Sequence, residues 1–452
     1  MPAPPMPMSA RPTPMSARPM PMPTPLPEVS KVLFGSQDAE RAWEPAPDGV
    51  FPPVAVHLSA AVLASADELL VLEGRSGDEV LCNRRPPAAL LRRLRALGCA
   101  AEVTEVPGDP DTAVEHRLAA GALPPGHARG RAPAPYAVVP FTAEAARALG
   151  AVGETVPAAV AARVNGKAWS NDFCRTRHLA GVAAAVRTAP ELAAAASAIE
   201  GPLVLKSPYG VAGRGASVIR DRRQLASFAR RLSQRRDQDT AGLLVQPYYR
   251  RVLDFSAHLD VGRDGRVGVV GFRGMTNRGL AFASSDTLAP EERRRLADDG
   301  RYRAVLTDLG TALAAAGYHG PVSVDGLLTD DGLLVPVLDV NARHSMGRYG
   351  LSLERLCADR CRVVGLYTAG VRVGVPYEQA YELISDALAH QGLLWEGTGP
   401  GATCLTAGTL QQPSGRLYFA AHADSAREAG EVAAAVRGVL GAGAPPWAGS
   451  AG

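Results

Sequence analysis

Short apolar runs alternate with charged and alanine-rich stretches along this chain, and the pattern predicts strands that alternate with helices. Order is expected to begin near Lys31, where a short apolar run ends at Gly35. Residues 88–97 predict a helix. Strands and helices in alternation are typical of a small α/β domain. The strands expected in this part of the chain are residues 31–34, followed by Gly35, and residues 54–56, 69–72 and 137–140.

The pattern changes after residue 140. Residues 142–200 are rich in alanine and are expected to be mostly helical. From 201 to 340, apolar strands are separated by glycine and acidic turns, with one charged helix near 290–316. The segment after about residue 371 predicts a helix, two strands at 402–410 and 415–422, and a final alanine-rich helix.

Residues 1–28 differ from the rest of the chain because they are rich in proline and methionine. Alternating prolines forbid a helix and little in this segment can pack, so we expect a disordered tail. The tail lacks the continuous apolar core of a signal peptide, and no apolar run approaches the length of a membrane span. The six cysteines show no paired framework, which is typical of reduced thiols. We therefore expect a cytoplasmic protein.

Size and charge narrow the class of protein. A chain of 452 residues is too long for one ordinary core, and two to four domains are expected. The net charge is only +3 and no dense basic cluster is interleaved with aromatic residues, so neither nucleic acid nor a membrane is an expected partner. Cys357 and Cys361 are four residues apart in a predicted helix, but no second pair or histidine cluster completes a zinc site. We assign them no metal.

Lysine is nearly absent from the chain: of 48 basic residues only Lys31, Lys167 and Lys206 are lysine. Lys206 ends an apolar run, and a glycine-rich stretch follows it to Gly215. The glycine order G-x-x-G-x-G, followed by a second apolar run, fits neither a Walker A loop nor a Rossmann fingerprint. It predicts a hairpin whose glycine loop can fold over phosphates. The alternative is a chance lysine at the end of an ordinary strand.

Acidic residues within two apolar runs form a second candidate site. Asp330-Asp331-Gly332 is typical of a hairpin turn, and this loop would pair residue 325 with residue 337. Alternation then places Asp325, Asp339 and Asn341 on one face, with the two aspartates as diagonal neighbours about 7–8 Å apart. These donors suit Mg²⁺. A shift by one residue would turn Asp325 to the opposite face, and solvated strand-end aspartates are the alternative.

Other polar residues extend these two sites. Arg343 lies two residues beyond Asn341, so strand alternation would place it on the same face as residues 339 and 341. There it can hold a phosphate or a carboxylate. A strand that breaks at Pro247 leaves Gln246 able to recognise a base edge, although an ordinary strand end fits as well. Arg273, with Asn277 and Arg278, is a candidate for binding a substrate carboxylate or tail, the alternative being a solvated surface loop.

Together these motifs resemble the ATP-grasp superfamily of carboxylate–amine ligases, and most closely its pheganomycin-type peptide ligases. The matching segments, in chain order, are Asn165-Gly166-Lys167, Leu203–Gly215, Val245–Tyr248, Asp254, Asp325 and Asp339–Arg343. The resemblance implies an α/β (α+β) ATP-grasp fold and the following divisions: a tail (1–28), a pre-ATP-grasp domain (29–140), an ATP-grasp domain (141–370, with subdomains 141–245 and 246–370) and a C-terminal segment (371–452) that completes the grasp or forms an interface.

The resemblance also implies roles for individual residues. ATP phosphates would be held by Lys167, Lys206 and the glycine loop with Gly213 and Gly215; the adenine would lie at Gln246 and Tyr248, the ribose at Asp254, and Mg²⁺ at Asp325, Asp339 and Asn341. Asp339 stands where the family has glutamate, and Ser323 where some relatives have arginine. Arg343 is therefore the arginine expected to contact the transferred phosphate.

The reaction implied is ATP-dependent amide formation between a carboxylate and an amino acid or peptide, through an acyl phosphate, in natural-product or antibiotic biosynthesis. A nucleotide-binding scaffold without catalysis and a carboxylate kinase that stops at the acyl phosphate remain alternatives. The sequence does not reveal the two substrates. The alanine-rich C-terminal helix leaves a homodimer open.

Overall fold

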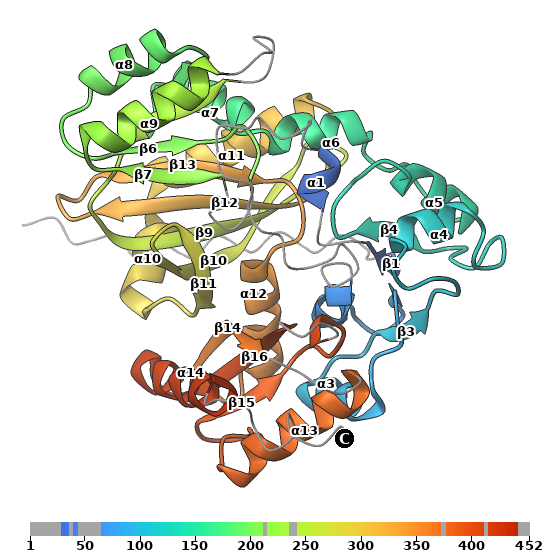
Figure 1. Cartoon of the computed structure of the whole chain (residues 1–452). Coiled ribbons are helices and arrows are strands. Elements are labelled where there is room, and N and C mark those ends of the chain that lie inside the picture. Colours follow the sequence, from blue (N-terminus) through green and yellow to red (C-terminus); the bar gives the residue numbers. More distant parts are fainter. Residues whose placement is uncertain are drawn as a thin grey trace, which may run out of the picture.

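The computed structural model describes residues 29–35, 39–43, 65–210, 215–234, 242–371, 377–410 and 415–441. Within these ranges the strands form two sheets of four strands and one of eight. Figure 1 shows the small sheet of β5–β8 with α8 and α9 at one end of the molecule and strands β14–β16 at the other, with the N-terminal sheet to one side. The expected strand at 54–56 and the expected disorder of the tail lie outside the described residues.

The N-terminal sheet is parallel and has the order β3-β2-β1-β4. Its strands are β1 (Lys31–Phe34), β2 (Glu79–Cys82), β3 (Glu102–Glu105) and β4 (Ala132–Pro135). Its helices are α1 (Ala39–Trp43), the 3₁₀ helix η1 (Ser65–Leu72), α3 (Ala88–Leu97), α4 (Val114–Ala119) and α5 (Thr142–Ala148). The predicted strand at residue 31 and the helix at 88–97 are confirmed.

Two predicted strands of this region are wrong. Residues 69–72 belong to the 3₁₀ helix η1, and all four side chains are buried. A continuous apolar run shows neither the two-residue period of a strand nor the period of a helix, so the sequence pattern could not distinguish the two. The last strand is 132–135 instead of 137–140. Its sequence Ala-Pro-Ala-Pro is tolerated because β4 is an edge strand, where proline's missing N–H leaves no gap in the ladder.

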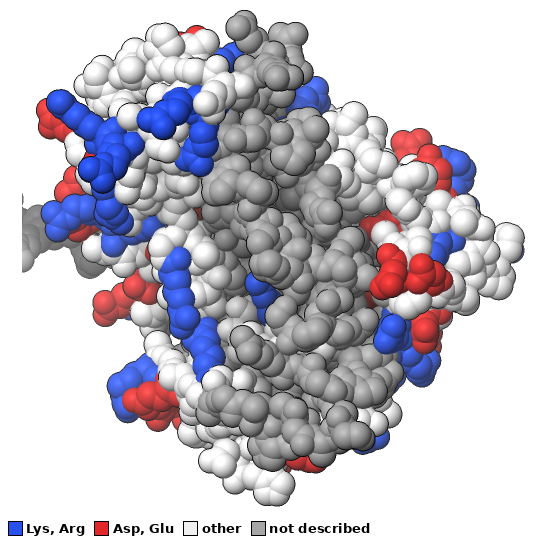
Figure 2. Space-filling view, viewed as in Figure 1, with Lys and Arg blue, Asp and Glu red and all other residues white. Residues whose placement is uncertain are grey.

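The small sheet is antiparallel, with the order β5-β8-β6-β7. Its strands are β5 (Ala184–Val186), β6 (Leu203–Lys206), β7 (Ala216–Ile219) and β8 (Leu243–Pro247). Helices α8 (Ala189–Ser197) and α9 (Arg222–Ser233) bury Leu192, Phe228 and Leu232 against it. The outer side of α9 carries exposed arginines, and basic side chains gather over this part of the molecule in Figure 2. The predicted hairpin around the glycine loop is confirmed by the pairing of β6 with β7.

The large sheet is antiparallel throughout and has the order β13-β12-β9-β10-β11-β14-β16-β15. Its strands are β9 (Arg251–Val261), β10 (Val267–Arg278), β11 (Ala281–Asp286), β12 (Gly320–Thr329), β13 (Leu334–Asn341), β14 (Val363–Val371), β15 (Gly401–Cys404) and β16 (Gly415–Ala423). The remaining helices are α6 (Ala158–Asn165), α7 (Lys167–Thr176), α10 (Pro290–Asp298), α11 (Gly300–Ala315), α12 (Met346–Cys357), α13 (Tyr377–His390), η2 (Gly408–Leu410) and α14 (Ala426–Gly441).

The sheets do not follow the expected divisions at every point. Ala145 on α5 and Leu149, which follows this helix, are buried in the same cluster as Val32 and Phe34, so the N-terminal unit continues past residue 140. The division expected between residues 245 and 246 falls inside β8. Strand β16 pairs with β14 along its length, so the segment after 371 belongs to the large sheet. The single charged helix expected near 290–316 is two helices, because Asp299 caps the N-terminus of α11.

Candidate active site

A cavity of about 300 Å³ lies between the small sheet and the large sheet. The side chains that line it come from β6 and β8, from the α6–α7 junction, from β9, β12 and β13, and from the chain that leads into α12. Most of the residues predicted to bind ATP and magnesium meet here: Lys167, Lys206, Gln246, Tyr248, Asp254, Asp325, Asp339, Asn341 and Arg343.

The two aspartates face each other directly across strands β12 and β13. Asp325 pairs with Asp339, not with residue 337 as the turn predicted. Nearer the turn, Leu327 pairs with Val335, which is the expected register, and the ladder shifts between these two pairs. Pro336 lies on β13 within the shift and has no N–H for the ladder, and β13 is an edge strand, where proline and bulges are tolerated.

A glycine opposite the shift makes room for it. A Cβ atom at Gly326 would lie 2.7 Å from the Phe255 ring and 3.1 Å from the Val335 carbonyl oxygen, so no larger residue fits without displacement. Beyond the shift, Asn341 Nδ2 donates to Asp325 Oδ2 at 3.3 Å. The structure therefore brings Asp325, Asp339 and Asn341 together, although by a different pairing from the one expected.

Two lysines approach these acids from the other side of the cavity. Lys167 Nζ forms an ion pair with Asp339 Oδ2 at 2.7 Å, and Lys206 Nζ lies 3.5 Å from the Leu338 carbonyl oxygen. Burial lowers the pKa of Lys206 to about 8, an effect that Lys167 adds to and Asp339 opposes. Burial, with the neighbouring Asp339 charge, raises the pKa of Asp325 to about 7. The neighbouring charges therefore compensate only part of the cost of burying the charged forms of Lys206 and Asp325. Shifted pKa values of this kind are common at functional sites.

The backbone around the α6–α7 junction fixes Lys167. The Lys167 N–H donates to the Pro208 carbonyl at 2.9 Å, which links the start of α7 to the chain after β6. Asn165 Oδ1 accepts from the Ala342 N–H at 2.9 Å and so links the end of α6 to the chain after β13. Lys167 is thus held between the chain that follows β6 and the chain that follows β13.

The proposed nucleoside end of the cavity is formed by β8 and the start of β9. Gln246 is buried, and its neighbour Tyr248 is held by a backbone bond from its N–H to the Pro202 carbonyl. Asp254 Oδ2 accepts from Asn277 Nδ2 at 3.0 Å. Gly215 adopts a φ of +73°, and a Cβ atom there would lie 3.0 Å from that of Ser207, so glycine is required. Gly213 lies outside the described residues.

The two arginines expected to contact substrate have different surroundings. Arg343 lines the cavity, and its guanidinium donates to Asn341 Oδ1 and Tyr136 Oη, each at 3.1 Å. Arg273 does not line it: the side chain is fully buried, paired with Glu354, and donates to the Val364 carbonyl at 2.7 Å. The expectation that Arg273 recognises a substrate is therefore corrected, because its donors already have partners in the core.

Several cavity residues were missed from the sequence. Tyr136 reaches the site from the N-terminal unit and holds Arg343, 207 positions away in the chain, so no local motif marks it. Ser256 pairs opposite Asp325 on β9 and bonds His258 Nε2 at 2.9 Å. Arg416 and Tyr418 line the end of the cavity formed by β16. Arg416 and Tyr418 are two residues apart in an otherwise apolar strand and so share one face. This alternation could have marked them as cavity residues from the sequence.

Searches for related proteins give one limited sequence match, and no family model matches the chain. The butirosin acyl-carrier-protein–L-glutamate ligase of Niallia circulans is 26% identical over 159 residues, which cover 33% of this chain and 35% of that relative. The match thus spans about a third of the relative's length.

Solved structures resemble most of the chain. N5-carboxyaminoimidazole ribonucleotide synthetase from Thermus thermophilus is 16% identical, with a TM-score of 0.53 over 92% of this chain and 99% of that one. Biotin carboxylase from Campylobacter jejuni is 12% identical, with a TM-score of 0.53 over 89% of each chain. The protein therefore has the ATP-grasp fold, as its sequence motifs predicted. No described helix is both long and apolar enough to cross a membrane.

Proposed function

We propose that the protein is an ATP-dependent ligase that joins a carboxylate to an amine through an acyl phosphate. The observation that carries this proposal is the meeting of two ammonium groups, two carboxylates and an amide across one cavity. Lysines on one side suit the phosphates of ATP, and acids on the other side suit the cation that accompanies them. Such an arrangement neutralises charge on a transferred phosphoryl group.

The donor set fits Mg²⁺. Asp325, Asp339 and Asn341 offer only oxygen ligands, which is the preference of this hard cation, and they lie at one edge of the sheet. Bound there, Mg²⁺ would neutralise charge on the phosphates. Lys167 now neutralises Asp339, so we expect its ammonium to turn toward a phosphate when the cation takes over that carboxylate.

The residues have separate roles in the proposed reaction. A substrate carboxylate oxygen attacks the γ-phosphorus of ATP, and ADP leaves with the electron pair of the broken P–O bond. An amine nitrogen then attacks the acyl carbon and expels inorganic phosphate, losing a proton. Lys206 and Lys167 hold the phosphates, Gln246 and Tyr248 the adenine, and Asp254 the ribose. Arg343, buried beside Asn341, contacts the phosphoryl group in transfer.

Two considerations favour an amino acid or peptide as a substrate. The partial sequence relative bears the name of a ligase for L-glutamate and an acyl-carrier protein, so an amino acid is one of its named substrates. Arg416, at the β16 end of the cavity, offers a guanidinium away from the proposed nucleotide, where a substrate carboxylate can bind. A role in natural-product biosynthesis, in the cytoplasm, is part of this proposal.

The test is a product assay with ATP, Mg²⁺ and pools of amino acids and short peptides. Release of ADP and phosphate that requires carboxylate and amine together, with a new amide found by mass spectrometry, would support the ligase. Release of ADP with carboxylate alone, trapped by hydroxylamine, would show a kinase. ATP binding without turnover in any pool of amino acids and peptides would contradict the proposal and favour a scaffold.

A further inference from the structure

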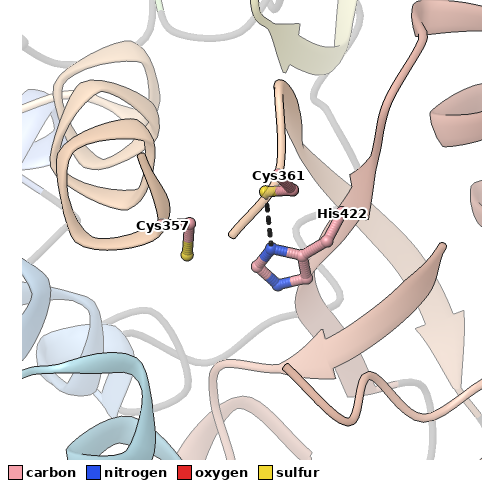
Figure 3. Close-up of side chains that lie close together, drawn as sticks. All are labelled: Cys357, Cys361 and His422. Atoms are coloured by element: carbon pink, nitrogen blue, oxygen red, sulfur yellow. Dashed lines mark hydrogen bonds between the residues drawn. The ribbon is translucent and has the colours of Figure 1, made fainter. Parts of the chain in front are cut away.

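A second cluster of chemically reactive side chains lies outside the cavity, where α12 ends against β16. Cys357, Cys361 and His422 present ligand atoms that all lie within 4.8 Å of one another, and Figure 3 shows the imidazole directed toward Cys361. Across the described parts of the chain, this is the one group of three or more histidine, cysteine or acidic side chains with that proximity. None of the three lines the proposed active site.

The local fold explains why the three residues meet. Cys357 is the last residue of α12, and the Cys361 N–H donates to the Cys357 carbonyl at 3.1 Å, which adds one more turn after the helix. Both thiols therefore lie near the helix end. His422 comes from β16, where it pairs with Val364 of the next strand, so its ring meets the thiols from the sheet.

The imidazole is held in one orientation. Its Nε2 atom lies 3.1 Å from the Thr403 hydroxyl, and Trp395 stacks on the ring at 3.9 Å with an interplanar angle of 12°. With Nε2 protonated and donating to Thr403, Nδ1 carries the lone pair. This atom faces Cys361, and a hydrogen bond on the far nitrogen is the usual support of a metal-binding histidine.

The spacing fits a tetrahedral ion of the zinc type. Zn–S bonds of about 2.3 Å and Zn–N bonds of about 2.0–2.1 Å place the two ligand atoms about 3.6 Å apart at a tetrahedral angle. Cys361 Sγ and His422 Nδ1 are 3.8 Å apart, so little movement is needed to admit the ion. Cys361 is only partly buried, which leaves a fourth position open to water.

The charge of the site and the type of its ligand atoms further limit which ion can bind. Two thiolates balance one divalent cation, so the site would be neutral in a region where Cys357 and His422 are fully buried. Sulfur and imidazole select soft or borderline ions over Mg²⁺. The nearby Arg360 guanidinium is engaged by the carbonyls of Leu97 and Leu356 and lies over Trp395, so it need not compete for the thiolates.

We propose that Cys357, Cys361 and His422 bind a thiophilic divalent ion such as Zn²⁺, with water as the fourth ligand. The ion joins the end of α12 to the C-terminal strands of the large sheet. This site is separate from the magnesium site in position and in ligand chemistry. The sequence hid it because His422 lies 61 positions beyond Cys361 in a strand without a motif.

The test uses cobalt as a spectroscopic probe of the intact, metal-depleted, reduced protein in excess Mg²⁺. We expect one equivalent of Co²⁺ to produce a thiolate-to-cobalt charge-transfer band, which Zn²⁺ then removes by displacement. Cys361→Ser should weaken Co²⁺ binding by at least about 100-fold, beyond the 10- to 100-fold effect typical of a supporting residue. Cys82→Ser is the matched control: it is a buried cysteine elsewhere whose donation to the Thr104 carbonyl serine can keep.

Each result bears on the proposal. Absence of the band in the reduced wild type would overturn it without reference to any variant. Equal affinity in Cys361→Ser would place the ion elsewhere and would also overturn it. A band that is present in the wild type and in Cys82→Ser, and lost in Cys361→Ser with unchanged circular dichroism, would support it. The readout is independent of ligase turnover.

Discussion

Two regions of this protein hold a pair of carboxyl groups, buried in η1 and half-buried in the cavity, and they stabilise the pair in opposite ways. In η1, Asp67 accepts from the Asn83 N–H at 2.5 Å and Glu68 from the Gly408 N–H at 2.7 Å. Burial raises the pKa of both groups, that of Glu68 to about 7. Neither carboxyl lines the cavity.

In the cavity, the aspartate pair has cationic side chains as neighbours instead. Asp339 is paired with Lys167, while Lys206 and Arg343 lie close by. Backbone donors are fixed and can favour one folded arrangement, whereas ammonium groups can exchange a carboxylate for a phosphate. We infer that the η1 pair stabilises a junction within the fold and that the cavity pair serves to bind a ligand.

The largest effect is expected for Asp339→Asn. The amide keeps the volume but removes a charge from the proposed magnesium site, so turnover should fall roughly 100- to 1,000-fold with the fold intact. Steady-state release of ADP, with circular dichroism as a check, measures this. Asp172→Asn, on the exposed side of α7, is the control. Wild-type turnover in Asp339→Asn would show that the cavity pair is as passive as the η1 pair.

A smaller loss is expected for Lys206→Arg. The planar guanidinium cannot occupy the point that the compact ammonium holds, and a displacement of this kind can cost turnover roughly 10- to 100-fold. Nucleotide affinity and turnover should both be measured. The same exchange at Lys31, which is exposed on β1, should change neither. If the two variants behaved alike, the phosphate role of Lys206 would be wrong.

Glu68→Gln should raise the free energy of unfolding at pH 8 but have little effect at pH 5. Because the pKa of Glu68 is raised in the folded state from 4.5 to about 7, the folded protein binds the proton more tightly than the unfolded chain. Wild-type stability therefore falls as pH rises from about 4.5 to 7. Glutamine carries no charge and can still accept from Gly408, so we expect a gain of about 1–2 kcal/mol at pH 8 and little at pH 5.

Thermal unfolding at the two pH values checks this prediction. Glu144→Gln, on the exposed surface of α5, should leave both unfolding temperatures unchanged. A gain for Glu68→Gln that is equal at pH 5 and pH 8 would show that the charge of the η1 pair is not the cause.

The smallest effect is a stabilisation by Mg²⁺ itself. At about five times its dissociation constant a ligand adds about 1 kcal/mol of stability, which thermal unfolding can detect. The wild type and Glu68→Gln should both gain, and Asp325→Asn should not. A gain retained in Asp325→Asn would move the cation away from the cavity pair.

The sequence predicted those parts of the site that depend on local order. The β6–β7 hairpin follows from glycines between two apolar runs, and the shared face of residues 339 and 341 follows from strand alternation. The direct pairing of Asp325 with Asp339 could not be predicted, because the register shift at Pro336 also requires the edge position of β13 and a glycine opposite.

Distant partners explain the other failures. Arg273 was expected at the substrate because it lies among polar residues, but its ion-pair partner Glu354 is 81 positions away on α12. A Cβ atom at Gly350 would lie 2.7 Å from Arg273 Nε, so the helix is fitted to this buried side chain. Such a fit depends on packing between elements, which a single sequence does not reveal.

The uninterrupted large sheet limits how the chain can be divided by engineering. Strand β14 pairs with β16 at nine consecutive positions, from Val363 with Ala423 to Val371 with Gly415. A truncation after residue 371 would expose that whole edge, which is a template for aggregation. Because Arg416 and Tyr418 also line the cavity, the C-terminal segment is not a removable module. Chimeras with related chains should therefore exchange β14 and β16 together.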